Sequence, residues 1–249
     1  MPGSNPSAGL EVLTANRNYY VRTDGSDLNN GSTNTAGGAF LTINRALRAA
    51  NLCIQDNFKI TVNVADGTYP ESVRVGGVPG KSSTVFPYTL FALIGNISNP
   101  GNVIINSIYG SNTTMEVAGF TILNGINCSV GSNFYVHACR TSTLYSGTGS
   151  FMYAEVITVI AGPYSDSFAT TYHGVMELYN IIVSAGLTFT QGFANALGGI
   201  IEFDDQPVGT TIGPKFKAQQ NGVINTYGGG LAYLPGSVAG TLTSGGQYV

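Results

Sequence analysis

The segment Met152-Tyr-Ala-Glu155 returns 24 residues later as Met176-Glu-Leu-Tyr179, and 25 residues after that as Ile201-Glu-Phe-Asp204. In each copy the first and third residues are apolar, while the second and fourth are polar or aromatic. Alternation of this kind is typical of a β-strand with one buried side and one exposed side. Three further copies continue the series at spacings of 19, 18 and 23 residues: Met115-Glu-Val-Ala118, Phe134-Tyr-Val-His137 and Ile224-Asn-Thr-Tyr227.

The period of this repeat favours stacked coils over other β-folds. A β-sandwich would need hairpins whose strands are joined by about two to five residues. Here the pattern returns once in 18 to 25 residues, as in a coil that circles once and stacks on its predecessor about 4.8 Å away. Leucine-rich repeats have similar periods, but their leucine and asparagine signature is absent. We therefore expect an all-β chain: a single-stranded, right-handed parallel β-helix, which is a solenoid.

Outside the repeat, one segment has helical spacing. Phe40, Ile43, Ala46, Leu47 and Ala50 recur at intervals of three and four residues, which predicts a helix of about three turns. A terminal coil exposes an apolar end that must be covered, so we expect this to be an N-terminal capping helix. The expected divisions are a flexible arm over 1–17 and a β-helix domain over 18–249, with the cap at 18–58, the coils at 59–230 and a closing segment at 231–249.

Several segments resemble the pectate-lyase-like β-helix proteins of bacteriophage particles, of the tail-spike and head-spike type. The resemblance covers most of the chain and is most evident in four stretches: Tyr19-Tyr-Val-Arg-Thr-Asp-Gly-Ser-Asp27, Phe40-Leu-Thr-Ile-Asn-Arg-Ala-Leu47, Ile60-Thr-Val-Asn-Val-Ala-Asp-Gly-Thr-Tyr69 and Tyr233-Leu-Pro-Gly-Ser-Val-Ala-Gly-Thr-Leu-Thr-Ser-Gly-Gly-Gln-Tyr248. It implies a homotrimer on the virion surface that binds or cuts host surface polysaccharide, and an N-terminal arm that attaches to other virion proteins. Because the chain is short for a depolymerising spike, we expect attachment to a cell-surface glycan.

Composition narrows the class of partner. Only 9% of the residues are charged, the net charge is −3, and no run of Lys or Arg occurs, which disfavours nucleic acid. No apolar stretch is long enough to predict a membrane-spanning helix. The three cysteines form no CxxC pair and the two histidines lie far apart. We therefore expect reduced, packed thiols, and neither a metal site nor a cofactor. The Asp-rich loop 24–31 lacks calcium-ligand spacing and is better explained by turn chemistry.

The alternation also predicts one outward-facing row of side chains. The second and fourth positions of the six copies hold five of the 13 acids and four of the 14 tyrosines. Aromatic faces stack on sugar rings, and carboxylates accept hydrogen bonds from hydroxyl groups. We expect the glycan-binding residues to be Tyr135, Tyr153, Glu155, Glu177, Tyr179, Glu202 and Asp204.

The same row allows two other interpretations. If Glu177 and Glu202 occupy adjacent coils, their backbones lie about 5 Å apart, near the separation of about 5 to 5.5 Å between the carboxyl groups of retaining glycosidases. A polysaccharide hydrolase using these two residues is therefore an alternative. The row could instead be an interface in a purely structural particle protein, because tyrosines are enriched at interfaces. A lyase is disfavoured because Arg140, the one Arg of the central coils, has no visible cluster of acids around it.

Overall fold

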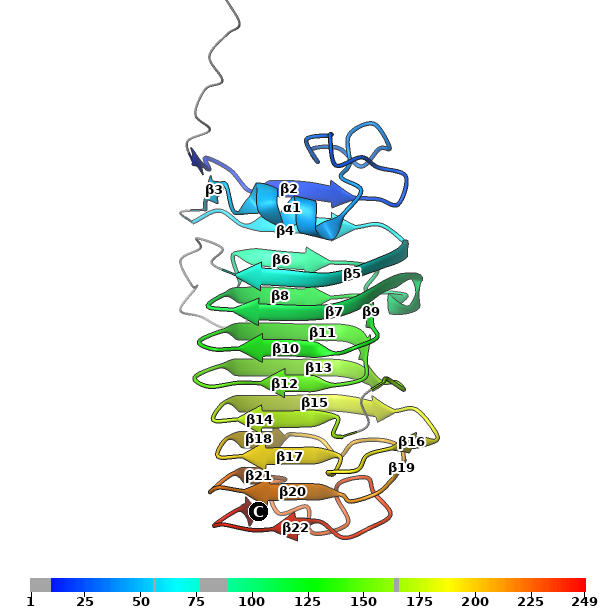
Figure 1. The fold of residues 1–249 in the computed structure, drawn as a ribbon, viewed down its shortest axis with the longest axis vertical. Helices are drawn as coiled ribbons and strands as arrows, with labels where there is room; N and C mark the ends of the chain where they lie inside the picture. The colour runs from blue at the N-terminus through cyan, green and yellow to red at the C-terminus, as the bar shows by residue number, and fades with distance from the viewer. Residues whose placement is uncertain (1–9, 56, 77–88, 164–165) are drawn as a thin grey trace, which may run out of the picture.

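The computed structural model describes residues 10–55, 57–76, 89–163 and 166–249, and its strands are stacked along one long axis (Figure 1). Nineteen strands belong to one large sheet, and every pairing given for it is parallel. The chain is therefore mostly β, and the one α-helix of the described residues is α1 (Ile43–Ala50). None of the helices in these ranges is long and apolar enough to cross a membrane.

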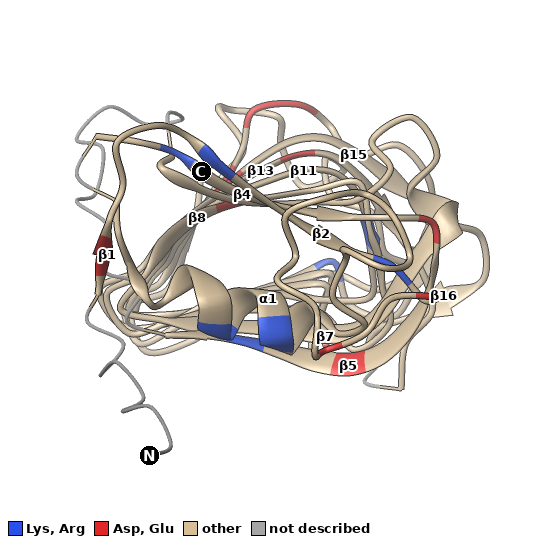
Figure 2. Cartoon of the chain, turned by 90° about the horizontal axis from the view of Figure 1, so that it is seen from above, with Lys and Arg blue, Asp and Glu red and all other residues tan. Residues whose placement is uncertain are grey.

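Most strands belong to one of two ladders on opposite walls, seen from above in Figure 2. Ladder 1 consists of β2 (Arg17–Val21), β4 (Ile60–Val64), β6 (Phe91–Ile94), β8 (Thr114–Ala118), β11 (Asn133–Thr141), β13 (Phe151–Val159), β15 (Val175–Val183), β18 (Ile200–Phe203), β21 (Val223–Asn225) and β23 (Gln247–Tyr248). Ladder 2 consists of β5 (Gly67–Gly76), β7 (Val103–Ser111), β10 (Ile126–Ser129), β12 (Leu144–Ser146), β14 (Ala169–Tyr172), β17 (Ala194–Leu197), β20 (Phe216–Gln219) and β22 (Thr241–Leu242).

Several shorter elements lie outside the two ladders or connect them. β9 (Thr121–Ile122) pairs with β7 and β11, and β16 (Leu187–Thr188) pairs with β19 (Thr211–Ile212). A 3-10 turn, η1 (Pro100–Asn102), precedes β7. β1 (Glu11–Val12) pairs with β3 (Cys53–Ile54) beside α1.

The space between the walls is filled by the inward rows of the ladders. Met176, Leu178, Ile201 and Phe203 are all fully buried, as the alternation predicts. The three cysteines are free and buried, which confirms the prediction of reduced, packed thiols. Burial raises the pKa of Cys128 and of Cys139 to about 12, so both remain protonated and unreactive at neutral pH.

The predicted helix is present but shorter than about three turns. Thr42 is extended and its side chain accepts a hydrogen bond from the backbone N–H of Arg45, so the helix begins at Ile43. Phe40 lies outside it, in a parallel bridge with Val21. The buried face is the predicted one: Ile43, Ala46, Leu47 and Ala50.

The helix covers the first edge of ladder 2. It contacts β5, and Asn44 accepts a hydrogen bond from the backbone N–H of Arg74 while donating to the carbonyl of Ser72. In return, the Glu71 carboxylate accepts from the backbone N–H groups of Ile43 and Asn44, at 2.8 and 2.9 Å. The helix thus satisfies polar groups of an edge strand that would otherwise be open.

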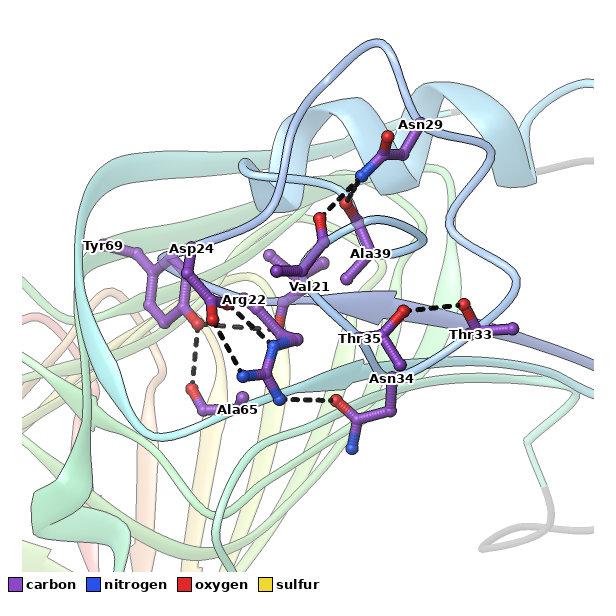
Figure 3. Close-up of polar contacts among 11 residues, drawn as sticks. Val21, Arg22, Asp24, Asn29, Thr33, Asn34, Thr35, Ala39, Ala65 and Tyr69 are labelled. Carbon is purple, nitrogen blue, oxygen red and sulfur yellow. Dashed lines mark hydrogen bonds and ion pairs between the residues drawn. The ribbon is translucent and has the colours of Figure 1, made fainter.

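The Asp-rich loop 24–31 is organised by hydrogen bonds within the protein. Arg22 forms an ion pair with Asp24 at 2.8 Å and donates to Asn34, as Figure 3 shows. The Asn29 amide donates to the carbonyls of Ala36 and Ala39. Asp27 accepts from the backbone N–H groups at 41 and 42. These contacts agree with the prediction of turn chemistry for this loop.

The two ends of the chain extend the stack. The expected arm at 1–17 falls partly on residues 1–9, which lie outside the described residues. Its remainder contains β1 and the buried side chain of Leu13, and β2 begins at Arg17. Within the segment 231–249, β22 and β23 add the last strands of ladders 2 and 1. The Tyr248 ring stacks on Phe216 with centroids 4.2 Å apart.

Candidate functional site

The predicted outward row lies on ladder 1, in the predicted register. Tyr135 pairs with Tyr153, Tyr153 with Glu177, and Glu177 with Glu202. Beside this column, Glu155 pairs with Tyr179. We call the side chains at the second and fourth positions of the six sequence copies the outer row of ladder 1: Glu116, Ala118, Tyr135, His137, Tyr153, Glu155, Glu177, Tyr179, Glu202, Asp204, Asn225 and Tyr227. Its members are half-buried or exposed with one exception: Ala118 is buried, because its short side chain lies between the longer Ile94 and His137.

At the end of this row nearer α1, the polar groups bind one another. The Tyr135 hydroxyl donates to one oxygen of Glu155, and the Tyr153 hydroxyl donates to the other at 3.4 Å. The Tyr135 ring also stacks on His137, with centroids 4.6 Å apart, and tilts against Tyr153 at 5.8 Å. This half of the row is a preorganised aromatic platform with a carboxylate fixed at its centre.

Glu116 closes the network at the β8 rung. Its carboxylate lies 3.0 Å from Nε2 of His137 and 2.8 Å from Nζ of Lys59, which comes from a loop 57 residues earlier in the chain. These partners, His137 foremost, hold the pKa of Glu116 at about 2, against an ordinary value of 4.5. Glu116 is thus ionised over the whole physiological range and has a structural role.

The other end of the row is an acidic surface with exposed tyrosines. Burial, reinforced by Glu202 and Asp204, raises the pKa of Glu177. The pKa of Asp204 is raised by burial and by Glu202, with a smaller contribution from Asp205. Repulsion between Asp204 and its neighbour Asp205 is therefore present, but it is not the main cause of the raised pKa. Glu202 accepts a hydrogen bond from the Asn225 amide at 3.2 Å.

The exposed tyrosines accompany these acids. Tyr179 is 40% exposed and Tyr227 is 63% exposed. Both are fourth-position residues of their sequence copies: Tyr179 lies in β15, beside Glu177, and Tyr227 follows the end of β21 by two residues. The arrangement offers flat apolar faces next to hydrogen-bond acceptors, which are the groups that a hydroxyl-rich ring needs. No group of three or more His, Cys, Asp or Glu side chains suited to a metal ion occurs within the described ranges.

Sequence reasoning located the seven candidate residues on one surface but did not reveal how they divide. Tyr135, Tyr153 and Glu155 form the bonded platform, whereas Glu177, Tyr179, Glu202 and Asp204 form the acidic end. Lys59 and His137 were missed as partners of Glu116. No periodic signal connects Lys59 with the repeat, so only the arrangement of the parallel strands in space reveals this contact.

Comparison of the chain with protein-family models, with curated proteins and with solved structures gave no match. A functional interpretation therefore rests on the geometry of the molecule and on the resemblance described from its sequence.

Proposed function

We propose that the chain is a single-stranded, right-handed parallel β-helix on the surface of a virion, and that as a homotrimer it attaches to a host cell-surface glycan. Each circuit adds one parallel strand to each ladder, and crossovers between parallel strands are right-handed in about 98% of cases. The virion assignment is supported by the phage-like segments of the sequence.

The observation that carries glycan recognition is the acidic end of the outer row of ladder 1. Tyr179 offers an exposed ring, and Glu177 and Glu202 offer acceptors on adjacent rungs. The row contains five carboxylates against one histidine, with Lys59 contributed from outside it. A carboxylated or sulfated sugar would be repelled by this charge. The favoured ligand is a neutral glycan rich in hydroxyl groups.

The test uses neutral polysaccharide prepared from candidate host capsules or lipopolysaccharide. Tyr153→Ala and Tyr179→Ala should each weaken binding, because each removes a stacking surface while its strand remains paired on both sides. Tyr172→Ala is the matched control, because Tyr172 is 44% exposed but lies on ladder 2. Equal binding by all four proteins would contradict the proposal.

A hydrolase remains the second candidate because of Glu177. A raised pKa is what a general acid requires, and its neighbour Glu202 lies on the adjacent rung. Glu177→Gln keeps the shape of the side chain and removes its charge. In a binding protein this should cost about 1.5–3 kcal/mol, the contribution of a hydrogen bond to a charged group. In a hydrolase, the release of new reducing ends should stop while binding remains nearly intact.

The third candidate, a purely structural interface, predicts a different outcome. If the outer row of ladder 1 packs against neighbouring copies, Tyr179→Ala or Glu177→Gln should change the oligomeric state in light scattering. That result would reject both the glycan-binding and the hydrolase functions for this surface.

A further inference from the structure

A polar groove, separate from the outer row of ladder 1, lies on the other wall of the molecule, on the outward side of ladder 2. It is a cavity of about 230 Å³ over β5, β7, β10 and β12. Four of its lining residues form one continuous register: Arg74 pairs with Tyr109, Tyr109 with Asn127, and Asn127 with Tyr145. The groove therefore presents a cation, an amide and two aromatic rings on four successive rungs.

The cation at the end of the groove is available. The Arg74 side chain is exposed, and its guanidinium lies 5.9 Å from the centre of the Tyr109 ring. Within the described residues, no carboxylate forms an ion pair with Arg74. The positions that continue this register along ladder 2 also contain no acid: Thr170, Asn195, Lys217 and Thr241.

The amide in the middle of the groove has an unused acceptor. Oδ1 of Asn127 is inaccessible to solvent and has no hydrogen-bond partner in the described part of the chain. Because solvent cannot reach this oxygen, a ligand in the groove contacts the N–H side of the Asn127 amide, which can donate to a sugar hydroxyl. Asn127 lies between Tyr109 and Tyr145, one rung from each.

The floor of the groove is held in place by its own hydrogen bonds. The Asn124 amide donates to Asn106, whose amide donates to the Ser72 hydroxyl at 2.9 Å. The cavity is smaller than the pockets of about 300–1,000 Å³ that enclose drug-sized ligands. It can receive one ring of a longer chain, with the remainder lying along the wall.

We propose that this groove binds an acidic sugar unit, of the hexuronic acid class, independently of the outer row of ladder 1. The sugar carboxylate forms an ion pair with the Arg74 guanidinium, because the planar N–H donors of the guanidinium match the two oxygens of a carboxylate. The apolar face of the sugar packs on a tyrosine ring, and one of the sugar hydroxyls accepts a hydrogen bond from the Asn127 amide N–H. The two walls then select opposite chemistry: neutral sugar on ladder 1 and acidic sugar on ladder 2.

The test is titration calorimetry of the full chain with a tetrasaccharide of alternating glucuronic acid and N-acetylglucosamine. The same tetrasaccharide with its carboxyls methyl-esterified serves as the uncharged ligand. We expect the ester to bind at least about tenfold more weakly, and Arg74→Gln to weaken binding of the acid by a similar factor. Lys217→Gln, which removes the same charge three rungs from Tyr145 on ladder 2, should change the affinity less than about twofold.

A second variant separates binding from folding. Asn127→Leu keeps the approximate shape, removes the amide N–H donor that lines the groove and also removes the unpaired buried oxygen, so it should weaken binding without lowering the melting temperature. Equal affinity for acid and ester, or equal losses in Arg74→Gln and Lys217→Gln, would overturn the assignment. Inorganic phosphate that displaces the tetrasaccharide as well as free glucuronate does would also overturn it.

Discussion

Single residues with unusual backbone geometry turn the chain in four successive strands of ladder 1, directly after β8 and within β11, β13 and β15. Gly119, Ala138, Val156 and Asn180 have φ between +49° and +78° and occupy equivalent positions in successive circuits. Glycine and asparagine tolerate this left-handed region, whereas a β-branched residue there is strained. Val156 is therefore the residue of the four with the most strained backbone.

Replacing Val156 with Asn should stabilise the protein. Val156 is 45% exposed and has φ of 54°, so the substitution relieves backbone strain and loses little burial. We expect a gain of about 1 kcal/mol in the free energy of unfolding, seen as a higher melting temperature. Asn180→Val at the equivalent corner should produce the opposite shift. A lower melting temperature for Val156→Asn would contradict the strain argument.

Glu116 gives the fold a pH dependence at the residue scale. Its pKa in the folded protein is about 2, below the ordinary value of 4.5, so the ionised form is the one that the native state stabilises. That stabilisation is complete above about pH 4.5. It is lost as the pH falls toward 2, where the folded protein also binds the proton.

We expect Glu116→Gln to remove about 1–3 kcal/mol of stability at pH 7 and to flatten the loss of stability between pH 4.5 and 2. Chemical denaturation across this range measures both effects. The matched control is Glu11→Gln, which breaks an exposed ion pair with Arg17 and should change stability by no more than about 1 kcal/mol. Parallel pH profiles for wild type and Glu116→Gln would show that the network with His137 and Lys59 contributes nothing.

At the scale of elements, the decisive property of each strand is which side faces the core. β18 shows this within four residues: Ile200 is 38% exposed, Ile201 and Phe203 are fully buried, and Glu202 lies in the outer row. A shift of one residue in register would turn every one of these side chains to the other side. The structure has the register that the alternation predicts.

Phe203→Asp should therefore be severely destabilising. The substitution removes a fully buried ring that lies 6.0 Å from the Phe193 ring and places a carboxylate among apolar side chains. We expect a loss of at least about 3–5 kcal/mol in the free energy of unfolding. Ile200→Asp also replaces an apolar side chain with aspartate, but on the outward side of the same strand, so its effect on stability should be mild. Equal effects of the two variants in thermal melts would mean that this register is incorrect.

At the scale of the whole molecule, the scarcity of surface charge is the feature to explain. Only 9% of the residues are charged, against about 25% in ordinary soluble proteins. Several apolar side chains are also exposed, among them the bridged neighbours Ile182 and Val208 at 44% and 65%. A surface of this kind is usually buried in part by symmetric assembly.

We therefore predict a trimer in solution at micromolar concentration. Light scattering should give three times the chain mass of 25.9 kDa. Tyr153→Ala and Tyr179→Ala should leave this mass unchanged if the outer row of ladder 1 is a binding surface. A monomeric wild type would remove the main support for the analogy with phage spikes.

The amino-acid sequence by itself determined the alternation within each strand, the spacing of the repeats, the buried face of α1 and the composition of the outer row of ladder 1. These properties are local, because the pleat of a strand and the turn of a helix set the direction of each side chain from its neighbours in sequence. A period of two places Phe203 inside and Glu202 outside before any partner is known.

The tertiary structure alone decided which side chains from different strands contact one another. Lys59 reaches Glu116 from 57 residues away, and Arg74 comes into one groove with Asn127 and Tyr145. Loops of different length separate these residues, so no fixed interval in the sequence connects them. Their contacts arise because the backbone hydrogen bonds between parallel strands fix the register of each strand against the next. Only this pairing joins separate alternating segments into two continuous surfaces, an acidic one on ladder 1 and one with Arg74 on ladder 2.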